Sequence, residues 1–206
     1  MNARSLLAPI RLLPVVVIDD ARTAAPLARV LLECGINAIE ITLRTDAALS
    51  AIENIRRDVP DVLVGAGSIT TPEHFQQILA AGASFAVSPG HTPALLDAAS
   101  LPFIPGAATP SDCMTLMEAG YDLIKFFPAE TNGGVAALRS WSGPLSAARF
   151  CPTGGINDDN VVDYLALDCV ACIGGSWFVP PDRLAAGDLE PVRELTKHAV
   201  ARVATK

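Results

Sequence analysis

The sequence predicts an α/β fold, and more specifically a (β/α)8 TIM barrel that occupies residues 1–206 as a single domain. Two observations predict it. Short β-rich runs alternate with longer helical patterns along the chain, and regular alternation of this kind produces a parallel sheet. Eight such units fit into 206 residues, which is the small end for a barrel, so we expect short loops.

Each expected strand is a short apolar run, and the eight runs are 15–18, 38–43, 62–66, 84–87, 102–104, 123–127, 149–151 and 170–173. The helical patterns between and after them are 24–34, 47–58, 71–81, 93–99, 111–119, 134–140, 158–165 and 191–203. A doubly wound open sheet is the competing fold. It usually has five or six strands and a glycine-rich loop after the first one, whereas Asp19-Asp20-Ala21-Arg22 stands there in this chain.

Composition excludes several classes of partner. The net charge is −7, and a phosphate backbone requires clustered lysine and arginine, so we expect no nucleic acid. No apolar run reaches the length of a membrane span, so we expect no membrane partner. Met1 to Pro14 lacks the pattern of a signal peptide, which makes a cytoplasmic protein the expectation.

The cysteines and histidines indicate neither disulfides nor a metal. Five cysteines are an odd number in a chain that is not small, which argues against a disulfide framework. Cys169 and Cys172 form a CxxC, but no second CxxC or nearby histidine completes a zinc site. His74, His91 and His198 are scattered without ligand spacing, so we expect no metal and no cofactor.

A lysine stands inside an apolar strand, in the run Asp122-Leu-Ile-Lys125-Phe-Phe. Strand alternation places Lys125 and Phe127 on one face and Ile124 and Phe126 on the other, so both faces are apolar. Burial favours the neutral amine, which is the form that attacks a carbonyl. The alternative is a lysine near the strand end that reaches solvent or pairs with a carboxylate.

Polar residues alternate along a second strand, where Glu40, Thr42 and Arg44 share one face. In a barrel strand the apolar residues pack against helices, so the polar ones point inward and rise toward the C-terminal end. There Glu40 is a candidate proton shuttle and Arg44 a candidate bidentate clamp for a carboxylate. The alternative is a buried structural pair of Glu40 with Arg44.

Glycine pairs follow the seventh and eighth predicted strands, as Gly154-Gly155 and as Gly174-Gly175-Ser176. Such turns let backbone N–H groups approach a ligand closely, and a helix following each turn would add its positive N-terminal dipole. The pattern predicts a phosphate site, unless the turns are only structural. Two further loops, at Ser68 and at Pro89, follow the third and fourth strands. We expect them to line the pocket at the C-terminal end of the barrel.

Eight short motifs in a fixed order resemble the 2-keto-3-deoxy-6-phosphogluconate (KDPG) aldolases, which also act on 4-hydroxy-2-oxoglutarate. The motifs begin at Glu40-Ile-Thr-Leu-Arg-Thr and end at Cys172-Ile-Gly-Gly-Ser-Trp. Between them lie Val64-Gly-Ala-Gly, Ser88-Pro-Gly, Ile104-Pro-Gly, Lys125-Phe-Phe-Pro-Ala-Glu, Asn132-Gly-Gly and Phe150-Cys-Pro-Thr-Gly-Gly-Ile. The resemblance spans nearly the whole chain and implies a barrel of the class I aldolase type, acting in the Entner–Doudoroff pathway.

The resemblance also implies roles for individual residues. Lys125 would form a Schiff base with the 2-keto carbon, and Glu40 would be the general acid and base. Arg44 would bind the pyruvoyl carboxylate, with Ser68, Thr153, Pro89 and Phe127 lining the substrate. The 6-phosphate would lie on Gly154, Gly155, Gly174, Gly175 and Ser176. Family members are typically homotrimers and need no metal.

The chain departs from the family pattern at Ser68, where the family's versions commonly have Thr. Three alternatives remain at this point. The first is an aldolase for the galactonate epimer, from a related family that has Pro and Asn where this chain has Thr42 and Arg44. Retention of Thr42 and Arg44 favours the gluconate type. The second alternative is a phosphate-binding barrel enzyme without a Schiff base, and the third is a sugar-acid sensor without turnover.

Overall fold

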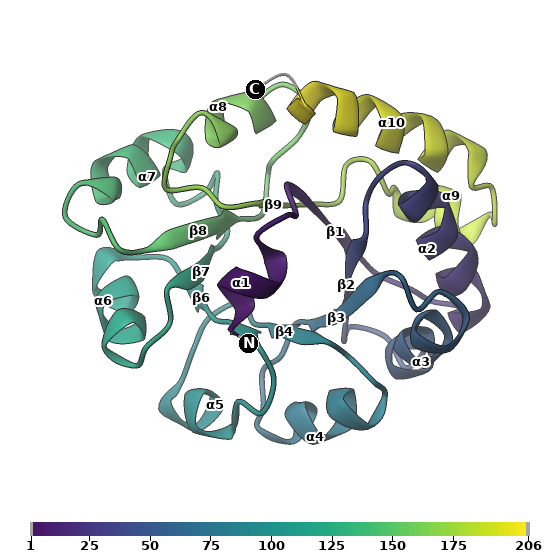
Figure 1. Cartoon of the computed structure of the whole chain (residues 1–206), viewed down its shortest axis with the longest axis horizontal. Coiled ribbons are helices and arrows are strands. Elements are labelled where there is room, and N and C mark those ends of the chain that lie inside the picture. Colours follow the sequence, from purple (N-terminus) through teal and green to yellow (C-terminus); the bar gives the residue numbers. More distant parts are fainter. Residues whose placement is uncertain (1, 205–206) are drawn as a thin grey trace.

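The computed structural model describes residues 2–204, in which parallel strands curl into a ring that is surrounded by helices (Figure 1). One sheet has six strands in the order β5-β4-β3-β2-β1-β9, and a second has three in the order β6-β7-β8. The strands are β1 (Leu12–Val16), β2 (Ala38–Thr42), β3 (Leu63–Gly67), β4 (Phe85–Val87), β5 (Phe103–Ile104), β6 (Gly106–Ala107), β7 (Leu123–Phe126), β8 (Arg149–Pro152) and β9 (Ile173–Gly175).

The helices lie outside the ring, except for the first one. They are α1 (Ala3–Leu7), the 3-10 turn η1 (Ala21–Thr23), α2 (Ala24–Glu33), α3 (Ala48–Asp58), α4 (Glu73–Ala80), α5 (Pro93–Ala98), α6 (Pro110–Glu118), α7 (Gly134–Ser142), α8 (Val161–Leu165), α9 (Pro181–Ala185) and α10 (Glu190–Ala204). The predicted α/β class and parallel sheet are confirmed. The sequence pattern missed the three short elements α1, η1 and α9.

The described sheet differs from the predicted single barrel of eight strands. The fifth predicted strand, 102–104, corresponds to β5, and an unpredicted strand, β6, follows it after Pro105; β5 pairs with β4, whereas β6 pairs with β7. Proline has no N–H to donate to a ladder, which explains the break between the two strands. The described residues therefore hold nine strands in two sheets.

Two predicted strands are displaced along the chain. The first begins at Leu12 instead of Val15, because Leu12 to Pro14 pair with β9 while Val15 and Val16 pair with β2. The last begins at Ile173 instead of Val170 and contains both Gly174 and Gly175. The prediction of a glycine turn after this strand was therefore wrong, because pairing with β1 overrides the low β-propensity of glycine.

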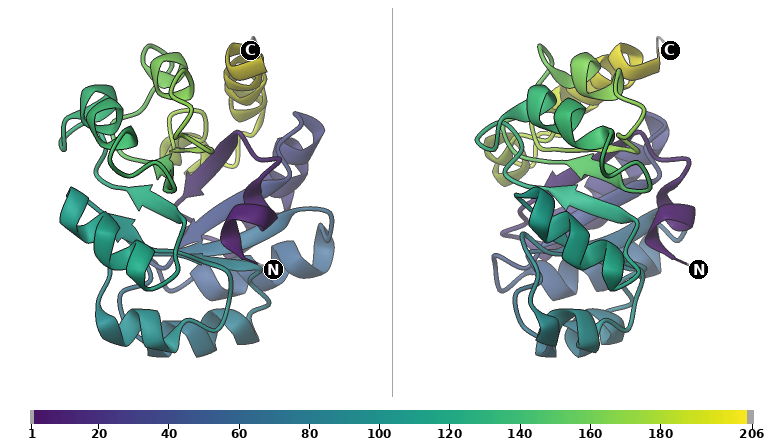
Figure 2. Two further views of the ribbon diagram at one scale, coloured as in Figure 1. Left: turned by 60° about the vertical axis from the view of Figure 1, so that its left-hand side comes forward. Right: turned by 90° about the vertical axis from the view of Figure 1, so that its left-hand side faces the viewer.

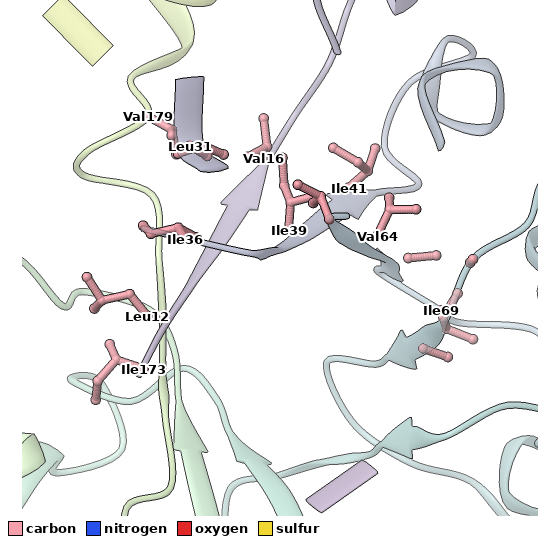
Figure 3. Close-up of a cluster of buried hydrophobic side chains, with 14 of the residues drawn as sticks. Leu12, Val16, Leu31, Ile36, Ile39, Ile41, Val64, Ile69, Ile173 and Val179 are labelled. Carbon is pink, nitrogen blue, oxygen red and sulfur yellow. The ribbon is translucent and has the colours of Figure 1, made fainter. Parts of the chain in front are cut away.

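Alternation along the strands separates two layers of apolar side chains. The larger layer lies between the sheet and the helices, and Figure 3 shows part of it, including Ile39 and Ile41 of β2. The smaller layer fills the inside of the ring. Its fully buried members include Leu13, Phe85 and Val87. Residues on either side of each strand therefore face two different environments.

Helix α1 closes the end of the ring at which the strands begin. It lies over the middle of the ring in Figure 1 and at one side of the molecule in the right-hand view of Figure 2. Ala3 and Leu7 pack into the inner apolar layer, and Arg4 pairs with Asp122 at 3.0 Å, just before β7. Polar side chains that could take part in a reaction are thereby confined to the opposite end of the ring, where the strands terminate.

Glycine in β3 is required by the packing inside the ring. A Cβ on Gly65 would lie 2.2 Å from the ring of Phe85, which is fully buried. We expect Gly65→Ala to lower the free energy of unfolding by about 1–3 kcal/mol through overpacking, measured by urea denaturation. Gly143→Ala is the matched control, because nothing lies within 4 Å of its Cβ position. Equal stability of the two variants would contradict this packing.

Candidate active site

Lys125 and Glu40 both point into the ring. Ile39 and Ile41 belong to the outer apolar layer, so Glu40 between them faces inward, and the same holds for Lys125 between Ile124 and Phe126. The inward orientation predicted for both residues is confirmed. Their side chains are only 6% and 1% exposed, respectively.

The two side chains form a buried ion pair across the ring, with 3.3 Å between Lys125 Nζ and Glu40 Oε1. The other carboxylate oxygen, Oε2, is buried and has no hydrogen-bond partner among the described residues. A buried acceptor without a partner is costly, so a water or a ligand hydroxyl is expected there. Glu40 thus pairs with Lys125 and not with Arg44, which removes the alternative of a structural Glu40–Arg44 pair.

Gly67 at the end of β3 provides the space for this carboxylate. A Cβ at this position would lie 2.0 Å from Glu40 Oε1. Thr42, the next inward residue of β2, is buried and donates its hydroxyl to the backbone oxygen of Val16 at 3.1 Å. The Thr42 hydroxyl is therefore already used in a hydrogen bond to the backbone. The carboxylate of Glu40 remains as the proton acceptor on this strand.

Other inward residues surround the amine. Lys125 Nζ lies 5.3 Å from the centre of the Phe127 ring, within the range of a cation–π contact. Cys151 is the neighbour of Lys125 on the adjacent strand. Its hydrogen bond with Cys172 lowers the pKa of the Cys151 thiol, and Lys125 acts in the same direction. The same hydrogen bond and burial raise the pKa of Cys172.

Arg44 and Ser68 meet at the rim of the ring. The guanidinium Nε of Arg44 donates to Ser68 Oγ at 3.1 Å, and Arg44 is exposed. Ser68 has a φ of 60°, a left-handed conformation that costs about 1–3 kcal/mol for a residue with a side chain. The remaining guanidinium donors of Arg44 suit a carboxylate.

The glycines of β9 face protein side chains. A Cβ on Gly174 would lie 2.2 Å from Thr153 Oγ1, and one on Gly175 would lie 1.9 Å from the Trp177 ring. Thr153 is buried, whereas Ser176 beyond the strand is exposed. Packing of Thr153 and Trp177 therefore accounts for glycine at both positions. The next helix, α9, begins only at Pro181, so no helix dipole acts at this glycine pair.

Gly154 and Gly155 form the predicted turn after β8. Both have positive φ angles, of 99° and 80°. The N–H of Gly154 faces the oxygen of Gly174 across the bridge between Thr153 and Gly174. Among the described residues, the backbone N–H groups of Gly155 and Ile156 have no acceptor. Successive free N–H groups of this kind make a concave anion site. The prediction of a helix starting at Asp158 was wrong, since α8 begins at Val161, and the turn itself supplies the donors.

Pro89 lies in the loop after β4 and is exposed. Its backbone oxygen occupies the space beside Gly106, where a Cβ would lie 2.2 Å from it. Gly106 pairs with Lys125 in the sheet, so this loop is tied to the strand next to the lysine. Gly67, Cys151 and Ile156 are not among the site residues predicted from the sequence. The glycine and the thiol could have been found from their inward strand positions, whereas a backbone N–H has no sequence signal.

Residues 2–204 contain neither a cluster of metal-binding side chains nor a helix able to cross a membrane. No group of three or more His, Cys, Asp or Glu side chains is arranged to hold a metal ion. No helix has the length and hydrophobicity needed to cross a membrane.

A buried amine beside a carboxylate, where parallel strands end, is the arrangement of enzymes that attack a carbonyl carbon through a lysine. The comparisons with known proteins agree with this class. The chain belongs to the KDPG and KHG aldolase family, whose sequence model matches residues 4–195. KHG denotes the 4-hydroxy-2-oxoglutarate substrate, and aldolases of this family are lyases.

Close relatives cover nearly all of the chain. A 2-dehydro-3-deoxy-phosphogluconate aldolase of Dickeya dadantii is 47% identical over 97% of this chain and 95% of its own length. The KHG/KDPG aldolase of Escherichia coli is also 47% identical, with the same coverage. The solved KDPG aldolase of Legionella pneumophila, with pyruvate captured as a covalent carbinolamine, is 42% identical. Its TM-score is 0.92, covering 96% of this chain and 97% of that one.

Removing one member of the buried pair should destabilise the fold. Lys125→Met leaves the Glu40 carboxylate buried without a counter-charge, and we expect a loss of about 3–5 kcal/mol in the free energy of unfolding. Adding Glu40→Leu should restore more than half of it. Lys197→Met is the control, because Lys197 forms an exposed pair with Glu194 and should leave stability unchanged. Wild-type stability of Lys125→Met would contradict the pairing.

Proposed function

We propose that the protein cleaves 2-keto-3-deoxy-6-phosphogluconate to pyruvate and D-glyceraldehyde 3-phosphate, and that it also cleaves 4-hydroxy-2-oxoglutarate. The observation that carries the proposal is the buried pair of Lys125 Nζ with Glu40, whose second oxygen has no partner. Two relatives at 47% identity are named as aldolases for these compounds, which supports the choice of substrate. The pathway is then the Entner–Doudoroff pathway, in which KDPG is cleaved.

The reaction begins at the ion pair. Glu40 takes a proton from the Lys125 ammonium, and the neutral amine attacks C2 of the keto acid to give a carbinolamine. Glu40 then returns the proton to the carbinolamine hydroxyl, which leaves as water, and an iminium remains. Glu40 accepts the proton of the C4 hydroxyl, directly or through a water at Oε2. The C3–C4 bond then breaks, and its electron pair moves toward the iminium. Glyceraldehyde 3-phosphate leaves, and an enamine remains on Lys125.

The second half returns the enzyme to its starting state. Glu40 delivers the proton back to C3 of the enamine, which restores the iminium. Water adds at C2, and the C2–N bond breaks to release pyruvate and the Lys125 ammonium, which pairs again with Glu40. One carboxylate serves all of these proton transfers because Oε1 lies 3.3 Å from the nitrogen that bears the reacting carbons.

Different loops would bind the two charged ends of the substrate. We assign the carboxylate to Arg44, with Ser68 and Thr153 beside it and Pro89 and Phe127 lining the site. We assign the phosphate to the turn of Gly154 and Gly155, whose N–H groups at Gly155 and Ile156 are free, together with Gly174, Gly175 and Ser176 as the family resemblance implies.

The other candidate functions have less support. Thr42 and Arg44 are both present, which favours the gluconate over the galactonate epimer. A barrel enzyme without a Schiff base would use Lys125 only electrostatically, and a sensor would require neither Lys125 nor Glu40 as a buried pair. Both predict that no covalent adduct forms.

We further propose that the two sheets act as one (β/α)8 barrel forming a single domain. Counting β5 and β6 as one strand gives eight strands, and the bridges Phe150–Val170 and Thr153–Gly174 connect β8 to β9. The predicted domain limits include Met1 and residues 205–206, which lie outside the described residues. We retain the proposals of a homotrimer and of a cytoplasmic location, which light scattering and cell fractionation test.

Borohydride reduction in the presence of pyruvate tests the Schiff base. The chain has three lysines, Lys125, Lys197 and Lys206, so peptide mass mapping can assign an adduct to one of them. We expect a reduced pyruvate adduct on the peptide with Lys125, retained in Lys197→Ala and lost in Lys125→Ala. A folded wild-type protein without this adduct would refute the proposed chemistry.

Removing the proton acceptor should slow the reaction without preventing substrate binding. We expect Glu40→Gln to lower kcat for KDPG cleavage by about 10²–10⁴-fold, as is typical for loss of general acid–base catalysis. Glu194→Gln is the matched control on the surface, and it should retain full activity. Turnover of Glu40→Gln at the wild-type rate would exclude Glu40 as the proton shuttle.

A further inference from the structure

A carboxylate–phenol pair that the mechanism does not use lies directly behind the Gly154–Gly155 turn. The hydroxyl of Tyr164, in α8, donates a hydrogen bond to Glu130 Oε1. Tyr164 is fully buried, and burial together with the bond to Glu130 raises the pKa of its hydroxyl. The phenol therefore remains a neutral donor, and it holds the Glu130 side chain in one position.

Glu130 in turn contacts the glycine turn. Its backbone N–H donates to the oxygen of Gly154 at 3.1 Å. Its Cβ and Cγ lie 2.7 Å from the position that a Cβ on Gly155 would occupy, so the side-chain stem packs directly against this glycine. The stem of Glu130 thus forms the floor on which the turn rests.

The residue that caps the same helix also restrains the turn. Asn160, the residue that precedes α8, donates from Nδ2 to the oxygen of Gly155 at 3.2 Å. Its Oδ1 accepts from the backbone N–H of Asn157 at 2.9 Å. Residues at both ends of α8 therefore act on the turn, one directly and one through Glu130.

These contacts fix the direction of the free donors. In a trans peptide unit the C=O and N–H groups point in opposite directions. Glu130 holds the oxygen of Gly154, which aims the N–H of Gly155 away from it. Asn160 holds the oxygen of Gly155, which in the same way aims the N–H of Ile156. Both N–H groups lack an acceptor among the described residues.

We propose that Glu130, held by Tyr164, is a positioning residue that sets the preference for phosphorylated over unphosphorylated 2-keto acids. The inference rests on the proposed function, because it assigns the phosphate of that substrate to this turn. Neither side chain touches the substrate in this account. Loss of the pair disorders the donors for the phosphate and leaves the amine and carboxylate of the reaction unchanged.

The experiment compares Tyr164→Phe, Glu130→Ala and Glu130→Gln on two substrates, KDPG and the unphosphorylated 4-hydroxy-2-oxoglutarate. We expect the first two variants to raise KM for KDPG about tenfold, the effect of losing one hydrogen bond, with kcat within about twofold. The KM and kcat for 4-hydroxy-2-oxoglutarate should not change. Glu130→Gln keeps the acceptor for Tyr164 and should resemble the wild type.

The control is Tyr121→Phe, which removes the other tyrosine hydroxyl of the chain, bonded to the oxygen of Leu96. This variant should have wild-type kcat and KM for both substrates. Equal losses on both substrates would assign Tyr164 and Glu130 a merely structural role, and unchanged kinetics in Tyr164→Phe would also overturn the inference.

A binding measurement separates this inference from the proposed function. Calorimetric titration with inorganic phosphate needs no turnover, so it applies even to a protein that cleaves neither substrate. We expect the wild type and Tyr121→Phe to bind phosphate with equal affinity and Tyr164→Phe to bind it about tenfold more weakly. Equal binding by all three, or no binding by the wild type, would overturn the inference. Absence of the borohydride adduct alone would refute only the aldolase chemistry.

Discussion

The ion pair between Lys125 and Glu40 is the constraint on which the rest of the structure depends. Two charged groups out of water are stable only when they face each other at close range, and a dehydration cost of several kcal/mol per ion opposes them. The apolar layer beneath them and helix α1 exclude water from one end of the ring. The open end, where the strands terminate, is thus the entrance for a substrate, and the lysine is held where a carbonyl carbon can reach it.

Glycine is the means by which the ring accommodates these groups. Gly67 leaves room for the Glu40 carboxylate, Gly174 for Thr153 and Gly106 for the oxygen of Pro89. Gly154 and Gly155 have positive φ angles, and the turn that they form presents the free N–H groups of Gly155 and Ile156. The glycines around the mouth therefore divide into those that make space for side chains and those that present backbone donors.

Strand alternation allowed the inward direction of Lys125 and Glu40 to be predicted, because two-residue periodicity depends only on local backbone geometry. The ends of β1 and β9 could not be predicted, since the stagger between neighbouring strands decides them. The pair of Glu130 and Tyr164 was also beyond sequence analysis. Those residues are 34 positions apart, and only the packing of α8 behind the turn brings them together.

A crystal structure of the protein with pyruvate would test the central claim most directly. The account predicts continuous density between Lys125 Nζ and C2 of pyruvate, with Glu40 within hydrogen-bonding distance and the pyruvate carboxylate on Arg44. Pyruvate bound at the ring without a bond to Lys125, or with Glu40 turned away from it, would contradict the account.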